Sequence, residues 1–206
     1  ISVGFSDSKR RDMLCNEVRI IMEDSTGHSF VEPADIEQTI QNKFGNLKGT
    51  PLHNINISLL EKILNNNPFV QNAEVFFTID GRLEIEVKQR NPIVRIINNN
   101  NESFYIDDEG VFMPLSDKYT ARVPVANGYI YSRETEQKIR DVSEVLSNDT
   151  SFHATLMEKI FLITDYIRHH DFWNEQIEQM YVNAEGEFEL VPLVGNHIII
   201  FGDATD

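Results

Sequence analysis

Alternating apolar and polar positions predict three strands in the first half of the chain. Residues 18–22 alternate in this way, which is typical of a half-buried strand. Two further alternating runs, residues 73–79 and 83–87, flank the dipeptide Asp80-Gly81. Because this dipeptide favours the positive φ angles of a type I′ turn, the two runs predict a β-hairpin.

Helical spacing predicts two helices between the first strand and the hairpin. Over residues 33–44 the apolar positions recur on one helical face, with Pro33 suited to the first turn and Gly45 to the position after the last. A second helix follows Asn56, and Ser58-x-x-Glu61 offers an alternative capping-box start. The order β-α-α-β-β predicts a sheet whose last strand pairs with both others and whose one face is covered by the helices.

Beyond Pro92 the pattern predicts a second, β-rich domain with two helices. Helical stripes are expected at residues 139–146 and 156–167, and the run from Asn98 to Asn101 is interpreted as a hairpin tip. Strands are expected at residues 93–97, 104–106, 111–113, 177–182, 188–191 and 197–201. We therefore predict an α+β chain, with a membrane-proximal stalk at residues 1–13, a β-α-α-β-β domain at 14–91 and a mixed β-sheet domain at 92–206.

The chain is acidic along its whole length, which excludes several kinds of partner. Its 206 residues include 18 Lys and Arg against 33 Asp and Glu, a net charge of −15. Binding to nucleic acid or to an anionic membrane surface needs clustered basic residues, and only residues 9–11 form such a run. The sequence contains no stretch of about 18 apolar residues, so it predicts no membrane span. The apolar residues 1–5 before a polar segment suggest the trimmed end of such a span and its stalk.

Candidate catalytic and metal-binding residues are few, and each fits a structural role. His169-His170-Asp171 suggests metal ligands, but adjacent histidines at a helix end point in different directions, and His is electrostatically favoured there. Asp107-Asp108 and Glu185-x-Glu187 fall at predicted turns, where acidic residues are expected. Cys15 has no activating neighbour and cannot form a disulfide by itself. We therefore predict no enzyme, no cofactor and no metal site.

Several motifs follow one another in an order known from one protein family. Residues 67–75, the hairpin and residues 87–93 are similar to a POTRA domain. Residues 104–110, 123–128 and 188–202 are similar to the β-rich domain that follows it. Together they resemble the extracytoplasmic region of the bacterial cell-division family FtsQ, called DivIB in Gram-positive bacteria.

Some features depart from the pattern of that family. Many relatives carry a Pro at the hairpin where this chain has Asp80-Gly81, and an acidic residue where it has Gln89. The Gln-Arg-x-Pro version of this motif, with the Asn-rich loops, resembles the Bacteroidetes branch of the family. Relatives also continue past the position of Gly202 with a helix and a strand, so we expect the second domain to be truncated at Asp206.

The resemblance implies a non-catalytic scaffold of the divisome that binds other division proteins at the septum. It implies a single-pass inner-membrane protein with this region in the periplasm, held by an N-terminal span absent from this chain. The implied partners are FtsB and FtsL, whose main contact in the family lies on the last strand, beyond Asp206. One alternative is a POTRA-bearing client-binding protein of outer-membrane protein assembly or secretion. Another is an acidic secreted enzyme with an unrecognised site.

Exposed sheet edges are the candidate binding sites, because an edge strand can pair with a strand of another protein through main-chain hydrogen bonds. In the first domain the strand at residues 73–79 is left at the edge, and its outward Phe76 lies between polar positions. In the second domain a terminal strand at residues 197–201 would expose apolar side chains. The predicted partner contacts are Glu74, Phe76, Thr78, Ile198 and Ile200.

Overall fold

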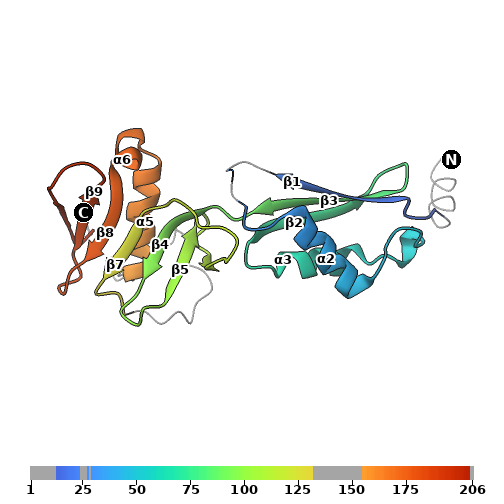
Figure 1. Ribbon diagram of the computed structural model, residues 1–206, viewed down its shortest axis with the longest axis horizontal. Helices are drawn as coiled ribbons and strands as arrows, with labels where there is room; N and C mark the ends of the chain where they lie inside the picture. Colours follow the sequence, from blue (N-terminus) through green and yellow to red (C-terminus); the bar gives the residue numbers. More distant parts are fainter. Residues whose placement is uncertain (1–12, 24–26, 28, 132–154, 205–206) are drawn as a thin grey trace, which may run out of the picture. The chain divides into compact units, whose positions relative to one another are not determined.

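The computed structural model describes residues 13–23, 27, 29–131 and 155–204, and the chain divides into two compact units, Ile1–Arg90 and Asn91–Asp206 (Figure 1). The stalk expected at residues 1–13 therefore lies, except for Met13, outside the described residues. Among the helices described, none has the length and apolar character that a membrane crossing requires.

The first unit has the predicted β-α-α-β-β order. Its three strands form a sheet of order β1-β3-β2, in which β3 runs parallel to β1 and antiparallel to β2. Both α-helices cover the same face of this sheet (Figure 1). The predicted pairing of the last strand with both others is thus confirmed. The elements are β1 (Glu17–Glu23), α2 (Pro33–Phe44), η1 (Leu52–Asn54), α3 (Ile57–Asn65), β2 (Val70–Phe77) and β3 (Arg82–Gln89).

Local signals set the ends of the two helices. Helix α2 begins with Pro33 and ends before Gly45, whose φ of 72° suits glycine, so its predicted bounds are confirmed. Helix α3 begins after Asn56, whose side-chain oxygen accepts a hydrogen bond from the Leu59 amide at 3.0 Å. The alternative start at Ser58 is therefore not used. Each helix presents buried apolar residues to the sheet, namely Ile36, Ile40, Leu60 and Leu64.

The hairpin turn differs from the predicted type I′ turn. The Gly81 amide donates to the Thr78 carbonyl at 3.1 Å, and the Thr78 amide donates to the Arg82 carbonyl at 3.0 Å. Gly81 has a φ of 85°, but Asp80 is not among the described residues with positive φ. This is a three-residue loop in which a type I turn is followed by a left-handed glycine. Strand β2 consequently ends at Phe77, and Ile79, predicted in the strand, is 90% exposed.

Side-chain hydrogen bonds explain why the loop takes this form. The Thr78 hydroxyl donates to Asp80 Oδ1 at 2.5 Å and accepts a bond from the Arg82 amide at 3.1 Å. The Arg82 guanidinium donates to Asp80 Oδ2 at 2.9 Å. The Thr78 hydroxyl first, and the Arg82 charge after it, hold the pKa of Asp80 below its ordinary value. The turn is therefore organised around the Asp80 carboxylate.

The second unit is built on a seven-stranded mixed sheet of order β10-β9-β8-β7-β4-β5-β6. Strand β7 runs parallel to both β4 and β8, and the remaining neighbours are antiparallel. The predicted mixed β-sheet domain is thus confirmed. Its elements are β4 (Pro92–Ile97), β5 (Ser103–Asp107), β6 (Phe112–Pro114), β7 (Val125–Gly128), α5 (Leu156–Arg168), α6 (Asp171–Gln176), β8 (Ile177–Val182), β9 (Phe188–Pro192) and β10 (Ile199–Gly202).

Of the two helices predicted for this unit, one is confirmed and the other lies outside the described residues. The stripe at residues 156–167 forms α5, whose apolar residues join those of the sheet in one core. A capping box starts α5, because the Thr155 hydroxyl accepts from the Glu158 amide at 3.3 Å and the Glu158 carboxylate accepts from the Thr155 amide at 2.6 Å. The stripe at residues 139–146 lies outside the described residues. The short helix α6 has no counterpart in the sequence prediction.

Gly128 is the glycine whose replacement the second unit should tolerate least. It has a φ of 104°, and a Cβ atom there would meet the carbonyl oxygen of Val182 in the neighbouring strand β8. We expect Gly128→Ala to destabilise the unit by roughly 1–3 kcal/mol or more, measured by urea denaturation. Gly186→Ala is the matched control, since Gly186 also has positive φ (83°) but nothing within 4 Å of its Cβ position. Equal losses in the two variants would contradict the steric argument.

The Asp80 turn gives a prediction about pH. Thr78→Val removes the hydroxyl at nearly constant volume, so the pKa of Asp80 should rise toward its ordinary value of 3.8. Because the folded-state pKa is lowered, the turn is stabilised above the unfolded pKa and loses this contribution as pH falls through the folded value. An NMR titration of the Asp80 carboxyl group tests this. An unchanged pKa in the variant would remove Thr78 as the main cause.

Candidate partner-binding edges

The predicted contact face on β2 is placed at the edge of the first sheet. Strand β2 pairs with β3 alone within the sheet, and Phe76 is 37% exposed opposite Glu84. Glu74 is exposed on the same face, opposite Glu86. Two carboxylates directly opposite each other repel, so this face favours an approaching positive charge beside the apolar Phe76 ring.

Thr78 differs from Glu74 and Phe76 in its local contacts. It lies beyond the end of β2, it is half-buried, and its hydroxyl is engaged by Asp80 and Arg82 in the turn. The structure therefore places Glu74 and Phe76 on the strand and Thr78 in the turn that follows it. The role of all three in binding stays a prediction.

The main chain of the β2 edge is largely occupied by side chains of α3. The Ala73 amide donates to Asn65 Oδ1 at 2.9 Å, and Asn65 Nδ2 donates back to the Ala73 carbonyl at 3.2 Å. One helical turn earlier, Glu61 accepts a hydrogen bond from the Val75 amide at 3.0 Å. A partner strand would have to displace these bonds, so a contact at β2 is better served by the side chains of its open face.

The β10 edge of the second sheet is more exposed than the β2 edge. Ile200 is 79% exposed, and Ile198, which lies just before the strand, is 57% exposed. Strand β6, at the opposite edge, is only three residues long and ends with Pro114, a residue that protects edges from pairing. Other large apolar residues of this end are also exposed, namely Leu193, Val194 and Phe201.

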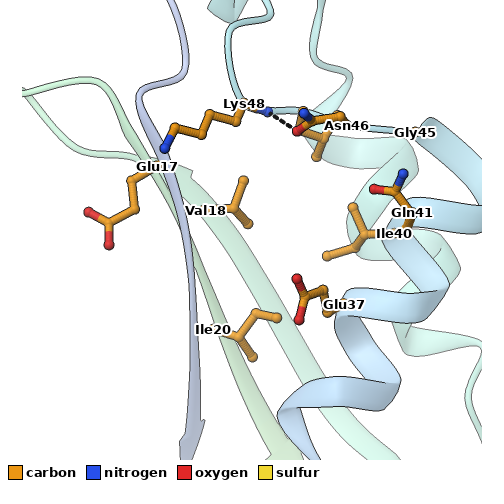
Figure 2. A pocket seen from close by; sticks show the side chains of 10 residues that line it. Glu17, Val18, Ile20, Glu37, Ile40, Gln41, Gly45, Asn46 and Lys48 are labelled. Carbon is orange, nitrogen blue, oxygen red and sulfur yellow. Dashed lines mark hydrogen bonds between the residues drawn. The ribbon is translucent and has the colours of Figure 1, made fainter.

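A groove that the sequence prediction missed lies between β1 and α2 (Figure 2). It has a volume of about 330 Å³, and apolar side chains from β1, α2 and the following loop line it: Val18, Ile20, Ile40 and Leu47. Charged side chains at its rim are Glu17, Glu37 and Lys48. The alternation of residues 18–22 predicts that one face of β1 is covered. It does not reveal that Val18 and Ile20 stay half-exposed beside the helix.

The chemistry-bearing residues singled out by the sequence have structural partners. The His169 ring lies 2.7 Å from the Asp165 carbonyl oxygen, and the His170 ring packs near Tyr166 and Trp173. Burial raises the pKa of the Cys15 thiol, which disfavours the reactive thiolate. Within the described ranges, no three His, Cys, Asp or Glu side chains are grouped as metal ligands.

A smaller cavity of about 210 Å³ in the second unit also carries no catalytic arrangement. Arg168, which lines it, donates to Asp165 Oδ1 at 2.8 Å, and the Thr164 hydroxyl donates to the Ile160 carbonyl at 2.8 Å. The two side chains are thus held by their own helix. The exposed sheet edges and the β1–α2 groove remain the best candidates for a functional site.

Comparisons with known proteins identify both units. Residues 13–88 match the family model described as a POTRA-like domain. Residues 91–206 match the family model described as FtsQ/DivIB, C-terminal related. No curated protein matches the chain. The two matches follow one another as the sequence motifs do and confirm the resemblance found there. The chain therefore belongs to the FtsQ/DivIB family of bacterial cell-division proteins.

Proposed function

We propose that this chain is a scaffold of the bacterial divisome, which holds other division proteins at the septum through its sheet edges. The exposed β10 edge carries this proposal, because Ile200 is 79% exposed on a terminal strand of the sheet that matches the FtsQ/DivIB model. An added strand would form main-chain hydrogen bonds with β10, and alternate side chains would set the specificity.

The family relationship supports the location and partners of this scaffold. In our proposal this region lies in the periplasm and belongs to a single-pass inner-membrane protein. Its partners are proteins resembling FtsB and FtsL. At a net charge of −15 the chain should associate faster with neutral or basic partners at low salt than at high salt.

Catalysis has no part in this proposal. FtsQ/DivIB proteins and POTRA domains are in general not catalytic. In the cavity of the second unit, Arg168 is held by its own helix, since it donates to Asp165 Oδ1 at 2.8 Å. A scaffold needs only accessible, specific surfaces, and these are what the two sheets offer.

A capture experiment tests the β10 edge. Purified segments resembling FtsB and FtsL are passed over the 206-residue chain, over its Ile200→Asp variant and over a version extended past Asp206 by the natural sequence. We expect capture by the chain and about tenfold weaker binding by Ile200→Asp, since a carboxylate would enter an apolar contact.

The extended version separates the possible results of this experiment. Capture by the extended version alone would move the main contact beyond Asp206. Capture by none of the three would contradict the division scaffold and favour the client-binding alternative. Val194→Asp is the matched control, because Val194 is 68% exposed but lies outside β10.

The open face of β2 gives a second prediction. Phe76→Asp should leave the fold intact, because Phe76 is already partly exposed, and should weaken a contact that depends on the first unit. Val75→Asp, one residue away, buries a charge at a position 4% exposed and should unfold the unit, as should Ile85→Asp. Recruitment to the septum by fluorescence microscopy is the readout. Unchanged recruitment of Phe76→Asp would remove this face from the proposal.

A further inference from the structure

Strand β1 has an open main-chain edge on the side away from β3. The Cys15 amide donates outward to the Thr50 carbonyl at 2.9 Å, whereas the Asn16 amide donates inward to the Gly81 carbonyl at 3.0 Å. The amide and carbonyl groups of successive residues in a strand point in alternate directions. The main-chain groups of the odd-numbered residues of β1 therefore point away from β3. These are Glu17, Arg19, Ile21 and Glu23.

No strand in the described part of the chain pairs with these outward groups, since β1 ends the sheet order. The loop that holds Thr50 covers this side of the chain before β1 begins, because the Gly49 amide donates to the Cys15 carbonyl at 2.7 Å and the Leu52 amide to the Met13 carbonyl at 2.9 Å. The Cys15 thiol lies 3.4 Å from the Glu17 carbonyl oxygen. From Arg19 to Glu23 the edge is therefore available, in contrast to β2, whose amides at Ala73 and Val75 are bonded to α3.

The β1–α2 groove runs along this same edge (Figure 2). Val18 and Ile20 point into it from the strand, and Ile40 faces them from the helix. A strand added to β1 would direct every second side chain toward this apolar lining and the others onto the open face of the sheet. The groove thus selects a segment with apolar residues at alternate positions.

The charges of the rim select the other positions of that segment. Neither the Glu17 nor the Glu37 carboxylate has a hydrogen bond or ion pair to another residue that the structure describes, and Glu23 ends the strand with a third negative charge. Lys48 is the one cation in the lining. Arg19, which lies between Glu17 and Glu23 on the open face, is paired with Glu84 at 3.9 Å. A partner with Lys or Arg on that face would therefore be attracted to the Glu17 and Glu23 carboxylates.

We propose that the β1 edge and the β1–α2 groove bind an extended, basic segment of a partner protein, which adds to the sheet as a fourth strand. The occupant has apolar residues at alternate positions and Lys or Arg between them. A second copy of this chain fits less well, because it would bring its own Glu17, Glu37 and net charge of −15 to an edge that is already acidic. The inference rests on the scaffold function and names one of its partner classes.

The test uses a synthetic peptide as the probe. It has about nine residues, a strand's length, with Val and Lys alternating. A scrambled peptide of the same composition, with its Val residues clustered, controls for simple charge attraction to an acidic protein. Fluorescence anisotropy with the 206-residue chain should give about tenfold tighter binding of the alternating peptide. Equal affinity of the two peptides would overturn the proposal.

Two substitutions at one position examine the main-chain contact. Arg19→Pro removes an outward amide without touching the inward ladder to β3, a position at which edge strands tolerate proline. Arg19→Ala keeps the amide and removes the same charge. We expect about tenfold weaker binding of the alternating peptide by Arg19→Pro than by Arg19→Ala. Equal binding by the two variants, with both folded by circular dichroism, would overturn the proposal.

A charge reversal keeps the proposal testable if Arg19→Pro does not fold. The double variant Glu17→Lys, Glu37→Lys should lose its preference for the Val/Lys peptide and gain one for a Val/Glu peptide. An unchanged preference, or a dimer of the unmodified chain by sedimentation that the peptide does not dissociate, would overturn the proposal. Capture of the FtsB-like and FtsL-like segments is measured beside it. Capture without peptide binding defeats this inference alone, whereas peptide binding without capture by either the chain or its extended version defeats the scaffold function.

Discussion

The first unit depends on the burial of β3 between two other strands. Its inward side chains, Leu83, Ile85 and Val87, are fully buried, and its main chain is paired with β1 on one side and β2 on the other. A three-stranded sheet with this order must have two edges, and two helices on one face cannot cover both edges and the opposite face. The presence of exposed sheet edges is therefore a consequence of the fold rather than of a particular cavity.

The two helices differ in how they contact these edges. Helix α3 lies close enough to β2 for Asn65 and Glu61 to bond to its outward amides, which closes that edge against pairing. Helix α2 leaves a groove along β1 and places no side chain on its outward amides in the described residues. In the second unit, Pro114 limits the β6 edge, while β10 exposes Ile200. In each unit, one sheet edge is thus protected from strand pairing and the other is exposed.

The sequence was sufficient to predict structural features that depend on the preference of a single residue or on a clear alternation. Pro33, Gly45 and Asn56 mark helix ends through their own backbone or side-chain preferences, and the alternating runs identify the hairpin. The predicted type I′ turn was wrong because the Thr78 hydroxyl donates a hydrogen bond to the Asp80 carboxylate. The turn preference of the Asp-Gly dipeptide does not include this contact. The groove could not be predicted at all, since the exposure of an alternating strand depends on the distance of a helix that packs on it. Helix α6 is too short for a periodic pattern.

Charge distinguishes the open edges from one another. At β10 the exposed side chains are large and apolar, so burying them on a partner is favourable whatever the partner's charge. At β1 the rim carries carboxylates that a neutral or acidic strand would have to desolvate without compensation, so only a basic strand gains from pairing there. A scaffold must hold several proteins at the same time without competition between them. Open edges of unlike chemistry meet this requirement, because a strand suited to one of them is poorly suited to the other.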